Sequence, residues 1–219
     1  MQERAVTTRR RILESAAVVF DRYGYAGATM AQILEEAGLT KGALYFHFAS
    51  KEELAKALFS EEERWSSLLA APRSDRPVQD VIDFTHIFAE ALIKDALVRA
   101  SIRMAIEYGT FTNQDQFTTY SMWAAALHTP LSRAQKRGHL RPDVDITTTA
   151  DTVVACFTGL QIMSQVVSQR SDLHERLAAW WTLTLPGLVP TLQAGGYQVG
   201  GSTADSDVVV PQEDAAAGL

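Results

Sequence analysis

The pattern of apolar and polar residues along the chain predicts helices almost throughout. Apolar positions recur at three- and four-residue spacing, as on one side of a helix, and no useful stretch alternates with the two-residue period of a strand. The helices are predicted at residues 7–23, 30–37, 41–47, 50–70, 78–94, 97–108, 116–138, 147–168 and 172–192. We therefore expect an all-α protein of about nine helices. A break or kink is expected at Pro130, because proline has no N–H to donate.

The stretch from Thr29 to Phe48 contains two helix starts in quick succession. Thr29 and Gln32 have the spacing of a reciprocal N-cap, in which each side chain bonds the backbone at the other residue. Gly38 is expected to end the first helix in the left-handed conformation that glycine adopts cheaply, and Thr40 is expected to cap the second. Two short helices joined by such a turn predict a helix-turn-helix, whose second helix normally lies in the major groove of DNA.

The residues in and around the second helix fit that function. They offer a hydroxyl, an ammonium, a phenol and an imidazole, which bond phosphate oxygens or base edges. On the other side, Leu44, Phe46 and Phe48 are expected to pack on the preceding helix. The predicted DNA contacts are Arg9, Arg10, Thr29, Thr40, Lys41, Gly42, Ala43, Tyr45, His47 and Lys51. The alternative interpretation is a buried helical hairpin with a few polar residues, preceded by arginines that form only a solvated run of charge.

The same region carries a longer motif. It consists of Gly24, Tyr25, Thr29, Ile33, Ala37, Gly38 and Leu39, the run TKGALYFHF from Thr40 to Phe48, and the run SKEEL from Ser50 to Leu54. With this motif the chain resembles the DNA-binding domain of the TetR family of bacterial repressors, densely over residues 7–58 and thinly beyond. The unbroken run TKGALYFHF is similar, more narrowly, to the γ-butyrolactone receptors of Streptomyces. The resemblance implies a homodimer that forms through its last two helices.

Composition adds constraints on charge and location. The chain has 219 residues and a net charge of −6, yet residues 1–50 hold six Lys or Arg against five Asp or Glu. A locally positive end is compatible with DNA binding, especially when two copies act together. The single cysteine, Cys156, excludes an internal disulfide. Polar residues after Met1 and the lack of a membrane-length apolar run lead us to expect a cytoplasmic protein without a membrane partner.

Three parts are expected along the chain. They are a DNA-binding domain at 1–50, a ligand-binding and dimerisation domain at 51–194, and a disordered tail at 195–219, where glycine, serine and acidic residues dominate. The helix predicted to start at Ser50 would leave the DNA-binding domain and act as a lever between the first two parts. The wide apolar faces of the last two helices predict a four-helix interface between protomers.

An all-helical second domain offers a cavity between its helices, the usual place for a ligand in a bundle. Trp123, followed by three alanines, is the strongest candidate for its wall. The resemblance implies the same for Trp123 and Thr158, and it places Glu62 where several receptors have a glutamine that reaches the ligand. An acid there would repel a carboxylate and favour a hydroxyl or a cation. The predicted ligand-binding residues are Glu62, Phe84, Phe88, Met104, Trp123, Thr158 and Gln161, with ordinary core packing as the alternative for each.

No catalytic motif is recognisable in the sequence. Gly-x-Ser-x-Gly, a Walker loop and His-Glu-x-x-His are all missing, and the five histidines lack metal-ligand spacing. We therefore expect no enzymatic activity, no cofactor and no metal. The main hypothesis is a homodimeric repressor that a γ-butyrolactone-type signal releases from palindromic operator DNA, in control of secondary metabolism such as antibiotic biosynthesis. The alternatives are a pseudo-receptor or drug-responsive repressor with another effector (a furan, a butenolide or an antibiotic), and a helical carrier or enzyme with a vestigial motif.

Overall fold

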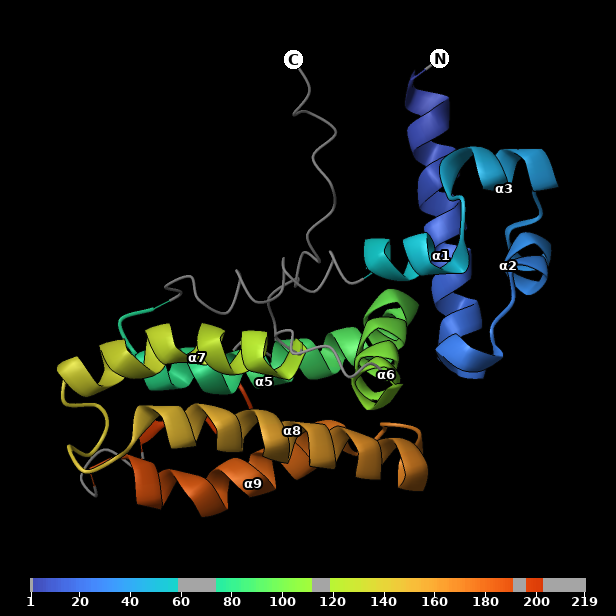
Figure 1. Cartoon of the computed structure of the whole chain (residues 1–219). Helices are drawn as coiled ribbons and strands as arrows, with labels where there is room; N and C mark the ends of the chain where they lie inside the picture. Colours follow the sequence, from blue (N-terminus) through green and yellow to red (C-terminus); the bar gives the residue numbers. More distant parts are fainter. Residues whose placement is uncertain (1, 59–73, 112–118, 191–195, 203–219) are drawn as a thin grey trace. The chain divides into compact units, whose positions relative to one another are not determined.

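The structure is a computed structural model and describes residues 2–58, 74–111, 119–190 and 196–202 (Figure 1). No described residue lies in a strand, so the described chain is all-α. Its helices are α1 (Gln2–Gly27), α2 (Met30–Ala37), α3 (Lys41–His47), α5 (Pro77–Lys94), α6 (Ala96–Phe111), α7 (Thr119–Lys136), α8 (Ile146–Ser168) and α9 (Leu173–Leu188). A further helical segment begins at Lys51 and is described as far as Leu58, so most of the predicted lever helix lies outside the described residues.

The chain forms two compact units that interleave along the sequence. The N-terminal unit comprises Met1–Trp65 and Lys94–Thr119, and the C-terminal unit comprises Ser66–Ile93 and Tyr120–Leu219. This division differs from the predicted boundary after residue 50. The reason is that α6, far along the sequence, packs against α1 even more extensively than α2 does.

Helix α1 is the central element of the N-terminal unit. Its apolar residues pack in one core with residues of α2, α3, α6 and the segment that starts at Lys51. Burial of each large side chain in such a core contributes about 1.5–3 kcal/mol. The fully buried members of that core are Ile12, Ala16, Ala17, Phe20, Ile33, Leu44, Leu54, Leu58, Ala100 and Met104.

Helix α1 kinks at Gly24, near its end, and a residue of α6 fixes this kink. Gly24 has φ 71° and ψ 172°, a backbone conformation nearly confined to glycine. The carboxylate of Glu107 lies where a Cβ at Gly24 would stand. The same carboxylate accepts a hydrogen bond of 2.7 Å from the backbone N–H of Tyr25. Glycine is therefore required here for two reasons, its backbone conformation and the close approach of Glu107.

Helix α5 is the centre of the C-terminal unit and is buried along nearly its whole length. Phe88 of α5 contacts Trp123 of α7 and Phe157 of α8. Thr85 accepts a hydrogen bond of 3.0 Å from the indole N–H of Trp181 on α9. Helices α5 and α7 lie together in Figure 1, and α8 and α9 form a second pair. The unit is therefore a helical bundle, as expected, in which α5 contacts α7, α8 and α9.

Two features of the C-terminal unit differ from expectation. Helix α7 continues through Pro130, so the break is absent, although the proline has no N–H to donate; Pro130 and its neighbour Leu131 are both buried. Residues 196–202, expected to be disordered, are ordered along α5. Their glycine- and serine-rich composition gave no sign of the polar side chains on α5 that bond to them. Residues 203–219 lie outside the described residues.

Replacement of Gly24 by alanine should destabilise the protein more than the same change at Gly138. Gly138 also has a positive φ, of 70°, but no atom lies within 4 Å of the position that a Cβ would take there. Gly138→Ala therefore measures the strain of a positive φ alone, about 1 kcal/mol. Gly24→Ala adds the less accessible ψ of 172° and the displacement of Glu107 from the Tyr25 N–H, together about 1–3 kcal/mol more. Urea denaturation of both variants measures the difference. Equal losses of unfolding free energy would contradict the proposed role of Glu107.

Candidate DNA-binding surface, aromatic cluster and protomer interface

The two predicted caps set the geometry of α2 and α3. Thr29 and Gln32 form the reciprocal N-cap, with both bonds present. Gly38 adopts the left-handed conformation, φ 61° and ψ 36°, and its N–H is directed at the carbonyls of Leu34 and Glu35. Thr40 then caps α3 by accepting a hydrogen bond from the N–H of Ala43. These local bonds produce the helix-turn-helix that the sequence predicts.

Helix α3 turns its polar side outward. Leu44 is fully buried and anchors the helix on the core, while Lys41, Gly42 and Tyr45 are exposed. The Lys41 ammonium lies 5.8 Å from the centre of the Tyr45 ring, so the two side chains occupy one surface. His47 is half-buried. The arrangement excludes the alternative of a buried hairpin, since the groups that could bond DNA face solvent.

Phe46 was expected to pack on α2, and this expectation is wrong. Its side chain is 81% exposed, the most exposed large aromatic residue of α3, and its ring meets His47 edge-on at 5.1 Å between centroids. The reason is the helical repeat: two positions after Leu44, a side chain points about 200° away from the buried face. Counting the repeat from Leu44 would have revealed Phe46 as a surface residue, and it joins the candidate contacts.

Lys51 was expected to contact phosphate, but its ammonium is already engaged within the protein. It donates hydrogen bonds of 2.8 Å to the carbonyl of Tyr25 and 2.9 Å to the carbonyl of Ala28, and it lies 4.6 Å from the Tyr25 ring centre. These carbonyls belong to the segment that follows the kink at Gly24 and leads into α2, which is here called the turn before α2. Lys51 therefore braces that turn, a role that favours stability over direct DNA contact.

The other predicted contacts outside α3 lie at the surface of the N-terminal unit. Arg9 is exposed, and its guanidinium stands 4.9 Å over the centre of the Phe48 ring. Arg10 is paired with Glu14 at 2.9 Å in an exposed ion pair, and such pairs contribute at most about 1 kcal/mol. Thr29 is exposed, although its hydroxyl serves the cap. Arg9 and Arg10 thus remain available to phosphate.

A polar clamp joins α1 to α6 within the N-terminal unit. Asp21 of α1 bonds the guanidinium of Arg99 at 2.7 Å, and both side chains are largely buried. Arg103 donates to the backbone carbonyl of Asp21 and pairs with Glu107 at 2.9 Å. Since Glu107 in turn accepts the N–H of Tyr25, the end of α1 is tied to α6 by consecutive bonds. This α1–α6 clamp was not visible in the sequence, because its partners are about 80 positions apart.

The aromatic residues predicted for the ligand cavity come together as one cluster. The centroid of the Trp123 ring lies 5.7 Å from that of Phe84 and 4.8 Å from that of Phe88, and Phe157 joins the cluster through Phe88 at 5.5 Å. The indole Nε1 of Trp123 is buried and has no hydrogen-bond partner among the described atoms. A buried donor without an acceptor costs about 1–3 kcal/mol. The cluster is therefore buried and apolar, and it contains one donor that no described atom bonds.

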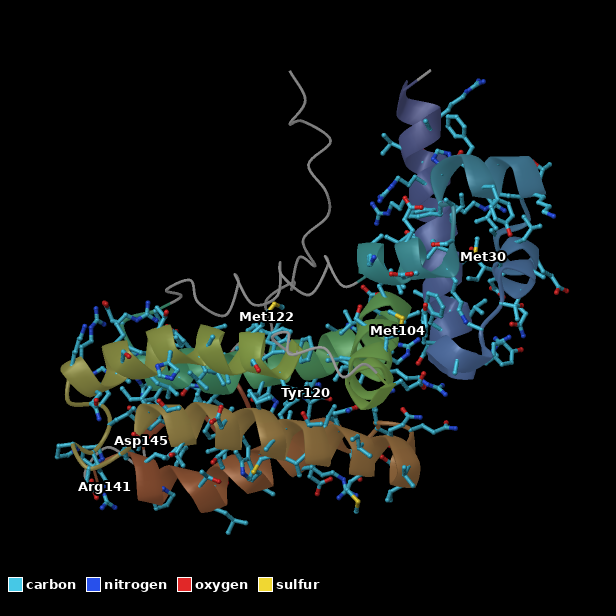
Figure 2. All side chains as sticks on the ribbon, viewed as in Figure 1. Met30, Met104, Tyr120, Met122, Arg141 and Asp145 are labelled. Atoms are coloured by element: carbon cyan, nitrogen blue, oxygen red, sulfur yellow. The ribbon has the colours of Figure 1, made fainter. Side chains whose placement is uncertain are left out.

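The remaining predicted ligand residues are distributed differently. The Thr158 hydroxyl donates to the carbonyl of Val154 in its own helix at 2.8 Å, and the buried Gln161 accepts from Arg170 at 3.4 Å. Met104 lies on α6, fully buried in the core of the N-terminal unit (Figure 2). Its assignment to the ligand cavity is corrected for this reason: its side chain packs with α1. Glu62 lies outside the described residues.

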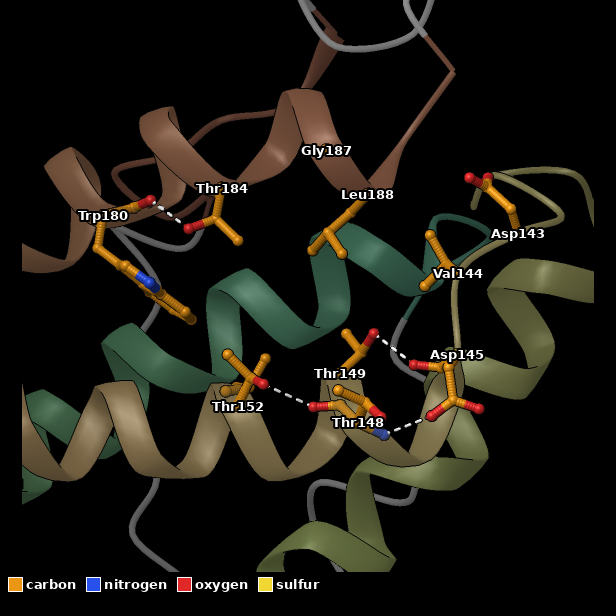
Figure 3. A pocket seen from close by; sticks show the side chains of 11 residues that line it. Asp143, Val144, Asp145, Thr148, Thr149, Thr152, Trp180, Thr184, Gly187 and Leu188 are labelled. Carbon is orange, nitrogen blue, oxygen red and sulfur yellow. Dashed lines mark hydrogen bonds between the residues drawn. The ribbon is translucent and has the colours of Figure 1, made fainter.

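A pocket of about 330 Å³ opens between α8 and α9 (Figure 3). The hydroxyls of Thr149, Thr152 and Thr184 donate to backbone carbonyls, so towards the pocket they can act only as acceptors. Trp180 and Leu188 complete a largely apolar lining. The pocket shares no residue with the predicted ligand site and is a separate feature of the C-terminal unit.

Helices α8 and α9 also carry an exposed apolar face. Val166 is 79% exposed and Leu183 83% exposed, and Ile162, Met163 and Val167 are exposed as well. Among the described helices, α8 alone has the length and hydropathy that crossing a membrane would need. An apolar face of this kind on a helical bundle is typical of a surface that a partner covers.

Comparison with known proteins accounts for both units. Residues 12–58 match the family "Bacterial regulatory proteins, tetR family", and residues 77–190 match the family "Tetracyclin repressor-like, C-terminal domain". The A-factor receptor protein of Streptomyces griseus is 40% identical over 187 residues, which are 85% of this chain and 66% of that protein. The chain thus spans slightly less than two thirds of this relative's length.

Solved structures show the same fold. The TetR regulator TylP of Streptomyces fradiae is 35% identical, with a TM-score of 0.76 over 90% of this chain and 93% of that one. A γ-butyrolactone receptor described as ArpA-like is 30% identical, with a TM-score of 0.76 over 89% of this chain and 94% of that one. With matches to both units and this level of identity, the chain belongs to the TetR family of bacterial regulatory proteins.

Proposed function

We propose that this protein is a homodimeric transcriptional repressor that binds a two-fold operator and is released by a small γ-butyrolactone-type signal. The observation that carries the proposal is the outward face of α3, held by two caps on a family-typical helix-turn-helix. A repressor of this kind works in the cytoplasm, and the relatives in Streptomyces favour a role in the control of secondary metabolism, including antibiotic production.

The DNA contacts are assigned to groups that the structure leaves at the surface. Lys41 and the hydroxyl groups of Thr40 and Tyr45 would bond phosphates, while Gly42 and Ala43 allow close approach of the backbone. The exposed ring of Phe46 suits apolar contact with a thymine methyl or a sugar. Arg9, Arg10, Thr29 and His47 are the flanking candidates. Lys51 is left out, since it serves the turn before α2.

Dimer formation is assigned to α8 and α9. Members of this family act as dimers, and the exposed apolar residues of α8 and α9 supply a self-complementary face for a four-helix interface. The pocket between the two helices opens beside exposed residues of α8, such as Thr148 and Thr152. A side chain of the second protomer would fill it. Two-fold symmetry of the dimer then requires two-fold symmetry of the operator.

The aromatic cluster is the proposed ligand site, formed by Phe84, Phe88 and Trp123. A γ-butyrolactone combines an alkyl chain with a polar ring, which suits an apolar wall and the single free N–H of Trp123. Thr158 and Gln161 are kept as candidates at the edge of the site. Another effector, such as a furan, a butenolide or an antibiotic, would use the same chemistry and is the second candidate function.

Release requires that the cluster be coupled to the DNA-binding surface. Helix α5 carries Phe84 and Phe88 and is joined through a single intervening residue, Asp95, to α6. Because the α1–α6 clamp ties α6 to the end of α1, a displacement of α6 would be passed to the helix on which α2 and α3 pack. Ligand binding would then favour dimers whose α3 helices no longer match the operator spacing.

The function is tested by gel-shift titration with palindromic promoter DNA, followed by release with γ-butyrolactones, furans, butenolides and antibiotics in parallel. Salt-sensitive binding to the palindrome and release by a γ-butyrolactone at the lowest concentration are expected. Release only by another class would support the second candidate. No preference for palindromic DNA would contradict both.

Lys41→Met should weaken operator binding about tenfold. It should also reduce the slope of log affinity against log salt concentration by the share of about two phosphate contacts per dimer. Lys51→Met is the matched control, because it removes an ammonium that bonds backbone carbonyls. The control should lose about 1–3 kcal/mol of unfolding free energy with an unchanged salt slope. Binding isotherms at several salt concentrations measure the slopes. Equal slopes for Lys41→Met and the wild type would remove Lys41 from the interface.

Trp123→Phe should keep operator binding and raise the effector concentration needed for release about tenfold, as expected for the loss of one hydrogen bond of about 1–1.5 kcal/mol. Trp181→Phe is the control, because the Trp181 N–H is already bonded to Thr85. That variant should lose stability and keep the wild-type response. Fluorescence-anisotropy release curves provide the readout, and an unaltered midpoint for Trp123→Phe would argue against the aromatic cluster as the ligand site.

Arg99→Met should leave operator affinity within about threefold and raise the effector concentration for release about tenfold, a typical size for allosteric coupling. The exposed pair of Lys56 with Glu52 supplies a control in the same unit, Lys56→Met, which should change neither quantity. Exchange of the two charges, Asp21→Arg with Arg99→Asp, should restore part of the response. A normal response of Arg99→Met would show that the clamp does not transmit ligand binding.

A further inference from the structure

Residues 196–202 follow one face of α5 and are bonded by three buried polar side chains of that helix. Gln79 exchanges two hydrogen bonds with the backbone of Gln198, at 2.9 and 3.0 Å. Asp83 accepts from the backbone N–H of Ser202 at 2.7 Å and from its hydroxyl. The spacing of Gln79, Asp83 and His86 places all three on the same side of the helix. We call residues 196–202 the C-terminal latch.

Further contacts make the docking of the latch specific. Arg76 bonds the carbonyl of Gly196 and stands 4.8 Å over the centre of the Tyr197 ring. Gly201 has φ 88°, and a Cβ there would lie 3.3 Å from the His86 ring. Backbone groups at several positions of the latch are thus hydrogen-bonded by side chains of α5 or of Arg76, the residue just before α5. Such matching is typical of a bound peptide segment rather than of a loosely placed tail.

The latch ends a chain of hydrogen bonds through two histidines. His86 Nε2 bonds the carbonyl of Val199 at 2.9 Å, the two Nδ1 atoms of His86 and His174 lie 2.9 Å apart, and His174 Nε2 bonds Glu90 at 3.0 Å. The rings are stacked, with 5.2 Å between their centroids. A carbonyl and a carboxylate accept only, so both Nε2 atoms must carry protons. The central bond needs a third proton.

Two neutral imidazoles carry only two protons, so the complete chain holds one proton more. Burial lowers the pKa of His86, so the bonds to Val199, His174 and Glu90 must together hold the additional proton on the pair. Two carboxylates of α5 act on the rings: Asp83 favours the charged form of His86, and Glu90 bonds His174 Nε2 at 3.0 Å. Repulsion between the two rings opposes a fourth proton.

Without the latch the proton count changes. His86 Nε2 would then face water, its single proton could move to Nδ1, and two neutral rings would complete the bonds to His174 and Glu90. The third proton is therefore required only when Val199 is docked. Docking binds a proton, which means that a fall in pH strengthens docking and a rise in pH weakens it.

We propose that residues 196–202 form a proton-dependent latch on α5, closed most firmly when the His86–His174 pair shares three protons. The latch holds the face of α5 opposite Phe84 and Phe88, so it limits the freedom of the helix that carries the aromatic cluster. The docking and its pH dependence are independent of the effector and of DNA binding. Acidification would thus reduce the motion of α5 within the C-terminal unit.

Hydrogen exchange of the full-length protein tests the latch directly. After correction for intrinsic rates, the amides of Gln198 and Ser202 should be about tenfold better protected at pH 6 than at pH 8, as expected for one charge-assisted hydrogen bond. His174→Gln should abolish this pH dependence. His128→Gln is the control, since His128 is another half-buried histidine, bonded to Thr147 on a different face. Protection that is absent, or equal at both pH values in the wild type, would overturn the proposal.

Nitrogen chemical shifts of the histidine rings provide a test that needs no variant. At pH 6 the proposal expects the two rings to carry three protons in all, with one proton on each Nε2. Two neutral rings, or His86 protonated on Nδ1 alone, would contradict the proton count. Retained pH dependence of protection in His174→Gln would do the same.

Discussion

Helix α1 must bury its apolar residues against two sets of partners at once, and the rest of the N-terminal unit depends on this constraint. The pair α2 and α3 packs on the same core as Ala100 and Met104 of α6. A helix shared in this way cannot shift relative to α6 without disturbing the support of α3. The hydrophobic core therefore fixes the position of α3. The α1–α6 clamp adds polar bonds between α6 and the last residues of α1, so a movement of α6 would be passed to α1.

In the C-terminal unit, α5 plays the corresponding central role. It is buried on all sides, although several of its residues are polar, and each of its faces meets a different partner. One side carries the rings of Phe84 and Phe88, Thr85 meets Trp181, and a third side bonds the C-terminal latch. Buried polar groups are tolerated when they are paired. The N–H of Trp123 is one of the buried side-chain groups without a partner among the described atoms, and its place in the aromatic cluster makes that cluster a candidate for ligand binding.

Local signals in the sequence predicted the local structure well. The cap at Thr29, the left-handed Gly38 and the cap at Thr40 depend on neighbours within a few positions, and all are confirmed. Phe46 was misplaced only because the helical repeat was not counted from Leu44. These features need no knowledge of distant residues.

Long-range partners could not be read from the sequence. Lys51 was predicted to contact phosphate because its neighbours in the sequence offer it no other partner. The two carbonyls that it bonds lie 23 and 26 positions earlier in the chain. Met104 is an apolar residue of a type that often lines ligand cavities. Only the packing of α6 on α1 shows that it belongs to the core of the N-terminal unit. The latch has the composition of a disordered tail, and the residues of α5 that order it precede it by 113–119 positions.

The central claim is that ligand binding in the helical bundle changes the separation of two α3 helices in a dimer. The most direct measurement is the distance between spin labels on the exposed residue 36 of α2, introduced as Glu36→Cys with Cys156→Ser so that each protomer carries one label. On operator DNA the labels should report one narrow distance, fixed by half-sites about 34 Å apart. Addition of the effector should release the DNA and shift or broaden that distance. The account would be contradicted if the effector released the DNA but left the label-to-label distance of the free dimer unchanged.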